Sequence, residues 1–449
     1  MRSSSKLRPS IAGNAADFLD TPTAPDTVSP TRAELIRAGL SATVGNWFEL
    51  FDFVIYGYFA GQIGETVFPS KDSVVTLLSA FATYGVGYIT RPLGSMVLGS
   101  IGDRHGRKAA LVFTLLTMAG ATGVTGLIPS YDSVGVAAPI MLVICRLLQG
   151  FATGGEWGGA TTFLVEYAPA HRRGVFGSLQ QITGNIAIVT AVATALILND
   201  VLTPGQLTEW GWRIPFLFGV LLAPLGFYLR SRVLDTPKFR AAAGHRPRYP
   251  LRDALSIHRL EVLTIFGMVI IWTVAGSTFS AFLVSFSTKM LGVTPAWAYS
   301  ATLVGAIANI VTCGISGYLS DRYGRKPFLI ASAAGFMVCA LPLFAIMASL
   351  RSGASVVFVA GVAGSLSGLF SGVAPTFLCE LLPTRVRYTA LSVGYNAAVM
   401  VFGGFAPLIC IMLIQHTGLL IAPAFYVTAC AAISLTVILS LRTRRPQLE

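Results

Sequence analysis

Long apolar runs separated by short charged segments make up most of this chain. Each run holds the roughly 20 apolar residues that an α-helix needs to cross a bilayer. The runs are continuous and do not alternate with polar residues, so they predict helices and no strands. In order, they predict twelve membrane-spanning helices over residues 36–61, 74–101, 109–129, 137–165, 174–198, 212–232, 261–288, 296–320, 327–349, 354–381, 388–414 and 419–441.

The charged turns between these helices carry an internal repeat. Residues 99–108 (GSIGDRHGRK) return as residues 317–326 (GYLSDRYGRK), 218 positions later. A second landmark, Glu166 with a proline three residues on, returns at Glu380, 214 positions later. Two landmarks at nearly one offset indicate two six-helix halves related by a parallel repeat, which is typical of secondary transporters.

The pattern divides the chain into five parts. Residues 1–33 are rich in Ser, Thr, Pro and Ala and lack the apolar core of a signal peptide, which indicates a disordered tail. The predicted parts are a cytoplasmic N-terminal tail (1–33), an N-terminal half (34–232), a cytoplasmic loop (233–260), a C-terminal half (261–441) and a short cytoplasmic tail (442–449).

Composition supports an integral membrane protein. Hydrophobic residues make up 54% and charged residues 12% of the chain, whereas soluble domains have about 25% charged residues. If both termini are cytoplasmic, all but six of the 32 Lys and Arg residues lie on the cytoplasmic side, as the positive-inside rule requires. The net charge of +12 is therefore a topology signal; lipid head groups are the expected contact, and no nucleic-acid partner is expected.

Several classes of chemistry have no support in the sequence. The six cysteines lie inside apolar runs without metal-ligand spacing, and no phosphate loop or dinucleotide fingerprint is present. No nucleophile with its base can be identified, and no soluble output domain that a receptor would need. We therefore expect no metal, no cofactor and no enzyme activity, and we expect an ion gradient to drive transport.

Two acidic residues inside the first predicted helix are candidates for proton coupling. Glu49 and Asp52 are three positions apart, so they share one helix face. A charge in the membrane interior costs about 2.5–3.5 kcal/mol on insertion scales and usually faces a partner or a polar path. Asp52 and Arg146 each lie about 15 Å from the outer end of their segments at 1.5 Å per residue. We predict that they meet and that protonation of Asp52 frees Arg146; a purely structural ion pair is the alternative.

A second charged pair is predicted nearer the cytoplasmic side. Arg91 and Glu156 lie about 25–28 Å into their segments, and we expect them to form an inner gate pair. Alternatively, Glu156 caps a kinked helix within its glycine-rich surroundings. Asn309 occupies the repeat position of Arg91, so the symmetry is broken there.

The repeated turns are predicted to complete this gate. Asp103 and the basic residues after it can pair with Glu166, and the second copy offers equivalent pairs. Such contacts would hold the inner side shut in one state and part in the other. The predicted gate residues at the turns are Asp103, Arg104, Arg107, Glu166, Asp321, Arg322, Arg325 and Glu380.

Polar side chains in the middle of other helices are candidates for substrate binding. Amides, phenols and a guanidinium can bond to carboxylate or hydroxyl groups of a solute, although each amide could instead bond a neighbouring helix. The candidates are Tyr56, Arg146, Gln180, Gln181, Asn185, Tyr395 and Asn396.

The motifs resemble those of a known family. The repeated Gly-x-x-x-Asp-Arg-x-Gly-Arg-Lys turn is similar to the signature of the major facilitator superfamily. Residues 45–53 (GNWFELFDF), 91–94 (RPLG), 149–156 (QGFATGGE) and 210–216 (WGWRIPF) resemble its metabolite:proton symporter family. The resemblance implies a multi-pass protein of the bacterial inner membrane that takes up a small organic acid, amino acid or betaine with a proton.

These observations lead to one functional hypothesis with two alternatives. We expect a monomeric, proton-coupled symporter that imports a small di- or tricarboxylate by alternating access. A zwitterion such as proline or glycine betaine is the first alternative, because one arginine and an aromatic face would hold it. Proton-driven efflux is the second, because the turn motif alone permits it.

Overall fold

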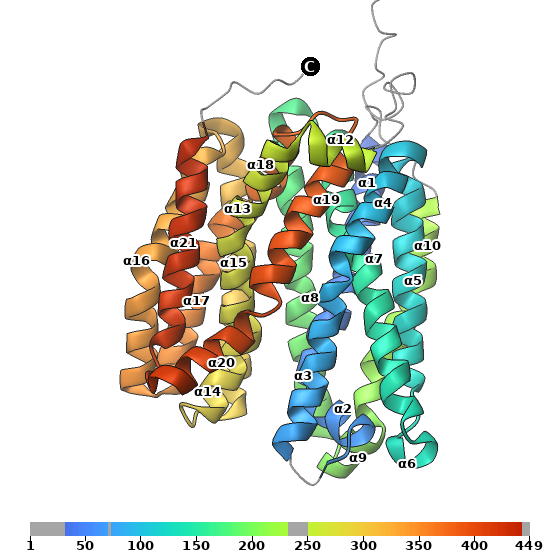
Figure 1. The fold of residues 1–449 in the computed structure, drawn as a ribbon, viewed down its shortest axis with the longest axis vertical. Helices are drawn as coiled ribbons and strands as arrows, with labels where there is room; N and C mark the ends of the chain where they lie inside the picture. The colour runs from blue at the N-terminus through green and yellow to red at the C-terminus, as the bar shows by residue number, and fades with distance from the viewer. Residues whose placement is uncertain (1–31, 71–72, 232–249, 442–449) are drawn as a thin grey trace, which may run out of the picture.

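The computed structural model describes residues 32–70, 73–231 and 250–441, and its helices follow the predicted apolar runs (Figure 1). No strand occurs in these three segments. Nine of their helical segments are long and apolar enough to cross a membrane. The other three predicted spans are also helical, in α1, α3–α4 and α10, which confirms the all-α membrane fold.

The first half is a bundle around a buried apolar cluster that contains Phe59, Trp212 and Phe216. Its α-helices are α1 (Arg32–Tyr58), α2 (Ala60–Val67), α3 (Ser73–Ile89), α4 (Arg91–His105), α5 (Arg107–Leu127), α6 (Tyr131–Val134), α7 (Ala137–Tyr167), α8 (Arg173–Val201), α9 (Pro204–Glu209) and α10 (Ile214–Ser231). Two 3₁₀ turns, η1 (Ala170–Arg172) and η2 (Gly211–Arg213), join its helices.

The second half packs around its own cluster, which includes Phe286, Phe336 and Phe344. Its elements are α12 (Pro250–Ser256), α13 (Arg259–Ser277), η4 (Thr278–Phe282), α14 (Leu283–Lys289), α15 (Pro295–Tyr323), α16 (Lys326–Leu350), α17 (Gly353–Ser371), α18 (Ala374–Glu380), α19 (Arg387–Ala398), η5 (Val399–Gly403), α20 (Ala406–Thr417) and α21 (Ala422–Ser440).

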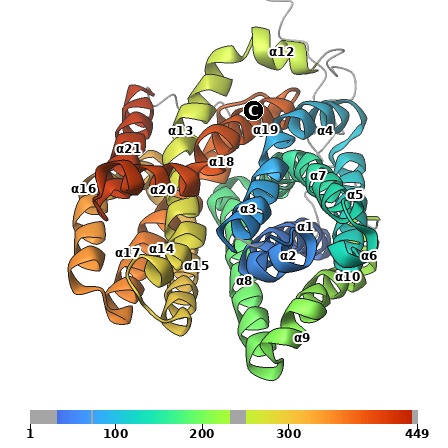
Figure 2. The same cartoon turned by 60° about the horizontal axis from the view of Figure 1, so that its bottom comes forward.

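The two halves lie side by side, as Figures 1 and 2 show from two directions. The contact between them runs along α8 and α15, and along α4 and α7 where they meet α19. The predicted boundaries of the two tails and of the loop between the halves stay predictions. The tails lie outside the described residues, apart from Arg32 and Ala33 at the start of α1, and so does most of the loop before α12.

The repeated turns share one backbone feature. Gly106 and Gly324 follow α4 and α15 with φ angles of 114° and 86°, a region that residues with a side chain rarely adopt. The glycine of each motif therefore permits the sharp reversal into the next helix. Both turns lie at the upper end of the bundle in Figure 1, which we call the turn end; the other end is the far end.

Glycines of α7 explain how closely the helices of the first half approach. A methyl group at Gly150 would overlap the Gly87 carbonyl oxygen on α3, and one at Gly154 would overlap the Arg91 carbonyl oxygen on α4. Gly158 is covered in the same way by Ser392 of α19. Small residues at these positions let backbones meet, and α7 thereby contacts both halves.

Candidate functional site

A cavity of about 270 Å³ lies between the two halves. Its wall comes from α1, α3, α4, α7 and α8 of the first half and from α13, α15, α17 and α19 of the second. The π-helical turns η4 and η5 interrupt the helical backbone beside it and contribute Ser280 and Gly403. Such turns are frequent at functional sites, and irregular backbone inside a membrane is tolerated where it lines a cavity. This central cavity is the candidate substrate site.

Three aromatic side chains form one wall of the central cavity. The rings of Trp157 and Tyr395 are stacked, with centroids 3.8 Å apart and planes 9° from parallel. Trp272 lies edge-on to both, at 5.7 Å from each, and its indole donates to Ser371 at 2.8 Å. The indole nitrogen of Trp157 is buried and finds no acceptor in the described segments. This aromatic wall joins α7 of one half to α13 and α19 of the other.

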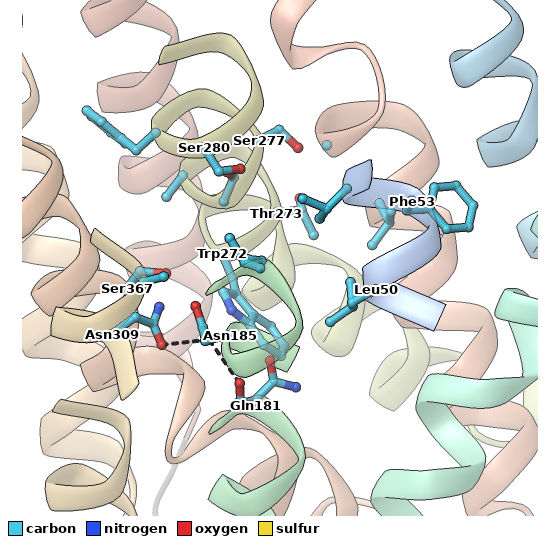
Figure 3. A pocket seen from close by; sticks show the side chains of 18 of the residues that line it. Leu50, Phe53, Gln181, Asn185, Trp272, Thr273, Ser277, Ser280, Asn309 and Ser367 are labelled. Atoms are coloured by element: carbon cyan, nitrogen blue, oxygen red, sulfur yellow. Dashed lines mark hydrogen bonds between the residues drawn. The ribbon is translucent and has the colours of Figure 1, made fainter. Parts of the chain in front are cut away.

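Amide side chains form the polar part of the same cavity. The Asn185 amide nitrogen donates to the Asn309 side-chain oxygen at 3.1 Å and to the Gln181 carbonyl at 2.9 Å (Figure 3). The first of these bonds joins α8 to α15 and so crosses between the halves. Asn396 donates to the carbonyl of Gly154 at 2.9 Å, and its own side-chain oxygen is buried without a donor among the described residues. Four predicted substrate-binding residues, Gln181, Asn185, Tyr395 and Asn396, thus line the cavity.

Arg91 and Glu49 are the charged side chains among the described residues that line the cavity. The Arg91 guanidinium lies over the rings of Tyr88 and Phe53, 4.3 and 4.5 Å from their centroids. The predicted gate pair of Arg91 with Glu156 is therefore wrong in its placement of Arg91. Arg91 belongs to the central cavity because α4 turns it toward these rings.

Glu156 takes neither of its predicted roles. It lies inside the continuous helix α7, so it does not cap a kink. Its carboxyl group is hydrogen-bonded to the Thr114 hydroxyl of α5, with the two oxygens 2.5 Å apart.

A buried charged cluster lies behind the cavity wall. Arg146 and Asp52 meet at 3.3 Å, and both side chains are 0% exposed, so the predicted contact is present. Asp52 also accepts from the Thr122 hydroxyl at 2.8 Å, and that hydroxyl accepts from the Gln149 amide at 2.9 Å. These bonds tie α1, α5 and α7 together around one carboxylate.

Three predicted substrate-binding residues lie behind the wall and not in it. Arg146 belongs to the charged cluster and stacks over the Tyr56 ring at 3.9 Å. The Tyr56 hydroxyl donates to the Ala80 carbonyl at 3.0 Å. The Gln180 amide donates to the Trp157 carbonyl at 3.1 Å and accepts from Thr161. Neither Tyr56 nor Gln180 lines the cavity, so the structure corrects their predicted positions and assigns their polar groups to helix packing.

At the turn end, two acidic residues of the repeated motif contact the opposite half. Asp103 of α4 accepts from the backbone N–H and the hydroxyl of Thr389, near the start of α19, at 2.9 and 2.7 Å. Asp321 of α15 accepts from the N–H groups of Gly174 and Val175, at the start of α8, at 2.9 and 3.3 Å. N–H groups at a helix start have no partner within the helix and favour negative charge. Each half therefore caps a helix of the other half.

A third contact across the halves joins Glu166 of α7 to Arg387 of α19 at 3.0 Å. Arg325, by contrast, bonds Asp321 at 2.9 Å and Glu380 at 3.3 Å within its own half, as the sequence predicts for this copy. We call the contacts of Asp103, Glu166 and Asp321 with the opposite half the turn-end gate. They hold the two halves together at this end of the cavity.

Three further predicted gate residues belong to the repeated turns. Arg104 and Arg322 are exposed, and the Arg322 guanidinium lies 5.5 Å from the Tyr323 ring centroid. The side chain of Arg107 lies outside the described part of the structure. The gate function of these residues stays a prediction.

Sequence reasoning missed four residues of these sites. Trp157 and Trp272 lie within apolar runs, where an indole gives no periodic signal. Arg387 and Thr389 lie in the first turn of α19, just after Arg385. The repeat of Arg172 and Arg173 by Arg385 and Arg387 was the only signal for them in the sequence.

Comparison with known proteins identifies the class that this fold and site define. The sequence profile of the Major Facilitator Superfamily matches residues 42–395 and 315–449. The chain therefore belongs to the major facilitator superfamily, and it is a multi-pass membrane transporter rather than an enzyme.

Particular relatives are similar over most of their length. The chain is 36% identical to a citrate-proton symporter of Klebsiella pneumoniae over 396 residues, covering 88% of this chain and 89% of the relative. It is 32% identical to a proline/betaine transporter of Escherichia coli K12 over 413 residues, covering 90% and 82%. Among solved structures, the proton:xylose symporter XylE bound to 6-bromo-6-deoxy-D-glucose has a TM-score of 0.77 at 17% identity, covering 91% of this chain and 95% of that one.

Proposed function

We propose that this chain is a proton-coupled symporter that imports a small zwitterion with one carboxylate, such as proline or glycine betaine, across the bacterial inner membrane. The main support is the charge balance of the central cavity. Arg91 and Glu49 supply one cation and one anion to a wall whose other described side chains are uncharged. This balance favours the zwitterion over the di- or tricarboxylate that we expected first from the sequence.

The aromatic wall supports the same solute class. The face of an aromatic ring attracts cations by about 0.5–2 kcal/mol, and more strongly where water is excluded. The Trp157, Tyr395 and Trp272 rings would hold the ammonium group of the solute, and Arg91 would hold its carboxylate. The unpartnered polar atoms of Trp157 and Asn396 would gain hydrogen-bond partners from the bound solute or its water.

The buried cluster supplies the proposed coupling. Protonation of Asp52 removes the negative charge that faces Arg146 at 3.3 Å. The Asp52 hydrogen bonds join α1, α5 and α7, and α1 and α7 also carry Glu49 and Trp157 of the cavity. A change of charge on Asp52 would therefore alter the packing of helices that hold the solute.

The turn-end gate supports alternating access. We propose that the turn end faces the cytoplasm, because the basic loops belong to this end and the positive-inside rule favours such loops on the cytoplasmic side. In the described arrangement this end is closed by contacts of Asp103, Glu166 and Asp321 across the halves. Import would require these contacts to part after solute and proton have bound from the far end. The cavity is built within one chain, and we propose that a monomer suffices.

The test is uptake into proteoliposomes under an inward proton gradient, with proline, glycine betaine, citrate, tricarballylate, 2-oxoglutarate and shikimate as solutes. We expect accumulation of a zwitterion that a protonophore abolishes. Replacement of Trp157 by Ala should weaken its apparent affinity by about tenfold or more, as expected for a desolvated cation–π contact of about 2 kcal/mol.

Uptake of a polycarboxylate is the second candidate. It is favoured by the 36% identity with a citrate-proton symporter, against 32% with a proline/betaine transporter. Accumulation of citrate or tricarballylate, with little effect of Trp157→Ala, would establish it. If no solute accumulates but efflux from loaded vesicles follows the gradient, the protein works as an antiporter and the proposed direction is wrong.

A further inference from the structure

A second, much smaller cavity lies between α1, α5 and α7. Its volume is about 10 Å³, close to the space that one water molecule needs. The polar side chains on its wall are Glu49 of α1, Thr114 of α5, and Thr153 and Glu156 of α7. Two carboxyl groups thus share a water-sized space inside the membrane part of the protein.

Two hydroxyl groups beside this space have unusual hydrogen bonding. The Thr153 hydroxyl is only 2% exposed, borders the small cavity, and has no hydrogen-bond partner among the described residues. The Thr114 hydroxyl lies within bonding distance of two acceptors, the Glu156 carboxyl at 2.5 Å and the Leu111 carbonyl at 2.9 Å. A hydroxyl has one hydrogen, so Thr114 can give a full hydrogen bond to only one of these acceptors, and a protonated Glu156 would satisfy both contacts by donating to Thr114.

The Asp52 cluster shows the opposite pattern. There the Thr122 hydroxyl accepts from Gln149 and can give its single hydrogen to Asp52, which suits an ionised carboxylate. Thr122 lies eight residues beyond Thr114 on α5, and Gln149 lies seven residues before Glu156 on α7. The same three helices therefore build two carboxyl sites, whose residues are about 11 Å apart along α5 and α7 and about 4.5 Å apart along α1 at 1.5 Å per residue, with the small cavity nearer the turn end.

We propose that Glu49 and Glu156 form a second proton site, in which the two carboxyl groups share one transported proton through a single bridging water. Repulsion between two carboxylates in a space of this size favours the singly ionised pair. Thr114 and Thr153 supply the other bonds to the carboxyl groups and the water. The other titratable or charged groups around α1 and α7 at this level are Asp52, Tyr88, Arg91, Arg146, Tyr388 and Tyr395.

The inference rests on the proposed proton symport and extends it. Each cycle would carry one proton on Asp52 and one on the Glu49–Glu156 pair. Because Glu49 borders both the central cavity and the small cavity, solute binding at Glu49 would be linked to the proton occupancy of the pair.

The first test needs no solute. Infrared spectra of the purified full-length protein are recorded across neutral pH, and the C=O stretch of protonated carboxyl groups is followed. We expect a band that is lost in Glu156→Gln and kept in Asp52→Asn. A band that persists in Glu156→Gln, or that depends on Asp52 alone, overturns the proposal. A band that sodium chloride removes at constant pH would assign the site to a sodium ion and would also overturn it.

The second test counts protons with labelled glycine betaine in proteoliposomes. With a gradient of one pH unit and no membrane potential, equilibrium accumulation is about tenfold for each coupled proton. We expect about 100-fold accumulation for the wild type and about tenfold for Glu156→Gln. Thr83→Val is the matched control, because the Thr83 hydroxyl donates to Ser79 in its own helix and borders neither cavity; it should behave as the wild type.

The outcomes separate this inference from the proposed function. Slower uptake by Glu156→Gln with the final accumulation of the wild type would make Glu156 a structural residue. If the wild type accumulates no solute of the panel, the proposed function fails, and the infrared test still decides whether the second proton site exists.

Discussion

The contact between Glu166 and Arg387 gives the sharpest test of the turn-end gate. Glu166 is 0% and Arg387 8% exposed at the side chain, and their charged groups are 3.0 Å apart. Arg387 also donates to the carbonyls of Cys379 and Leu382, which lie in its own half. Only the bond to Glu166 must break when the halves part, so its loss should destabilise the gate-closed state alone.

The size of the effect follows from the chemistry of this contact. Glu166→Gln keeps an acceptor for Arg387 and removes the negative charge. A hydrogen bond to a charged group contributes about 1.5–3 kcal/mol, against about 0.5–1.5 kcal/mol for a neutral one. We expect the balance to move toward the gate-open state by about 1–3 kcal/mol, which is about 5- to 150-fold in the population ratio.

Distances between spin labels at His105 and Tyr323 would measure this shift. Both side chains are exposed, they follow Asp103 and Asp321 of the gate, and they belong to opposite halves. Cysteines introduced there can be labelled selectively once Cys339 is replaced by Ser, because the other five cysteines are buried. In Glu166→Gln, the population with widely separated labels should increase at least fivefold over the wild type.

A carboxylate with its partner in its own half provides the control. Glu261 lies 3.8 Å from His258, and both belong to the second half near the turn end. Glu261→Gln should leave the distances unchanged. If Glu166→Gln also leaves them unchanged, the Glu166–Arg387 bond does not restrain the gate, and the reasoning from its burial is wrong.

Three further predictions concern the cluster, the cavity and the packing. Asp52→Asn should lower uphill accumulation by about tenfold or more while counterflow of labelled solute persists; equal loss of both would exclude a coupling role. Asn309→Ala removes the 3.1 Å hydrogen bond with Asn185 across the cavity. A hydrogen bond contributes about 1 kcal/mol, so solute affinity measured by titration calorimetry should change by about fivefold. Unchanged affinity would count against the place of Asn309 in the site. Gly150→Ala should lower the thermal midpoint by about 2 °C or more, since the methyl group overlaps Gly87, whereas Gly120→Ala meets no atom within 4 Å and should not.

Local features of the chain were enough to predict the helices and their order. The apolar runs predicted α7 over residues 137–165, and it spans Ala137–Tyr167. The contact of Asp52 with Arg146 was also predictable, because helix rise alone places both residues at one depth. Because an unpaired charge in the membrane interior is costly, two opposite charges at one depth are expected to pair.

The direction in which each side chain points could not be predicted in the same way. Gln180 and Gln181 are neighbours, yet Gln181 lines the central cavity while Gln180 bonds α7. Successive residues of a helix point about 100° apart, and in a helix that is apolar on most sides no polar stripe marks the cavity face. For the same reason Arg91 and Glu156, at similar depth, lie in two different cavities.

The sequence by itself determined an all-helical membrane protein with two repeated halves and a buried acid beside a buried arginine, since these depend on segment length, composition and depth. Only the tertiary structure decided that Asp103 and Asp321 each cap a helix of the opposite half, and that Trp157, Trp272 and Tyr395 meet at one wall. The physical reason is that these contacts join segments far apart in the chain. They depend on the rotation of each helix about its axis and on the docking of the two halves. No local pattern of residues predicts either the rotation or the docking.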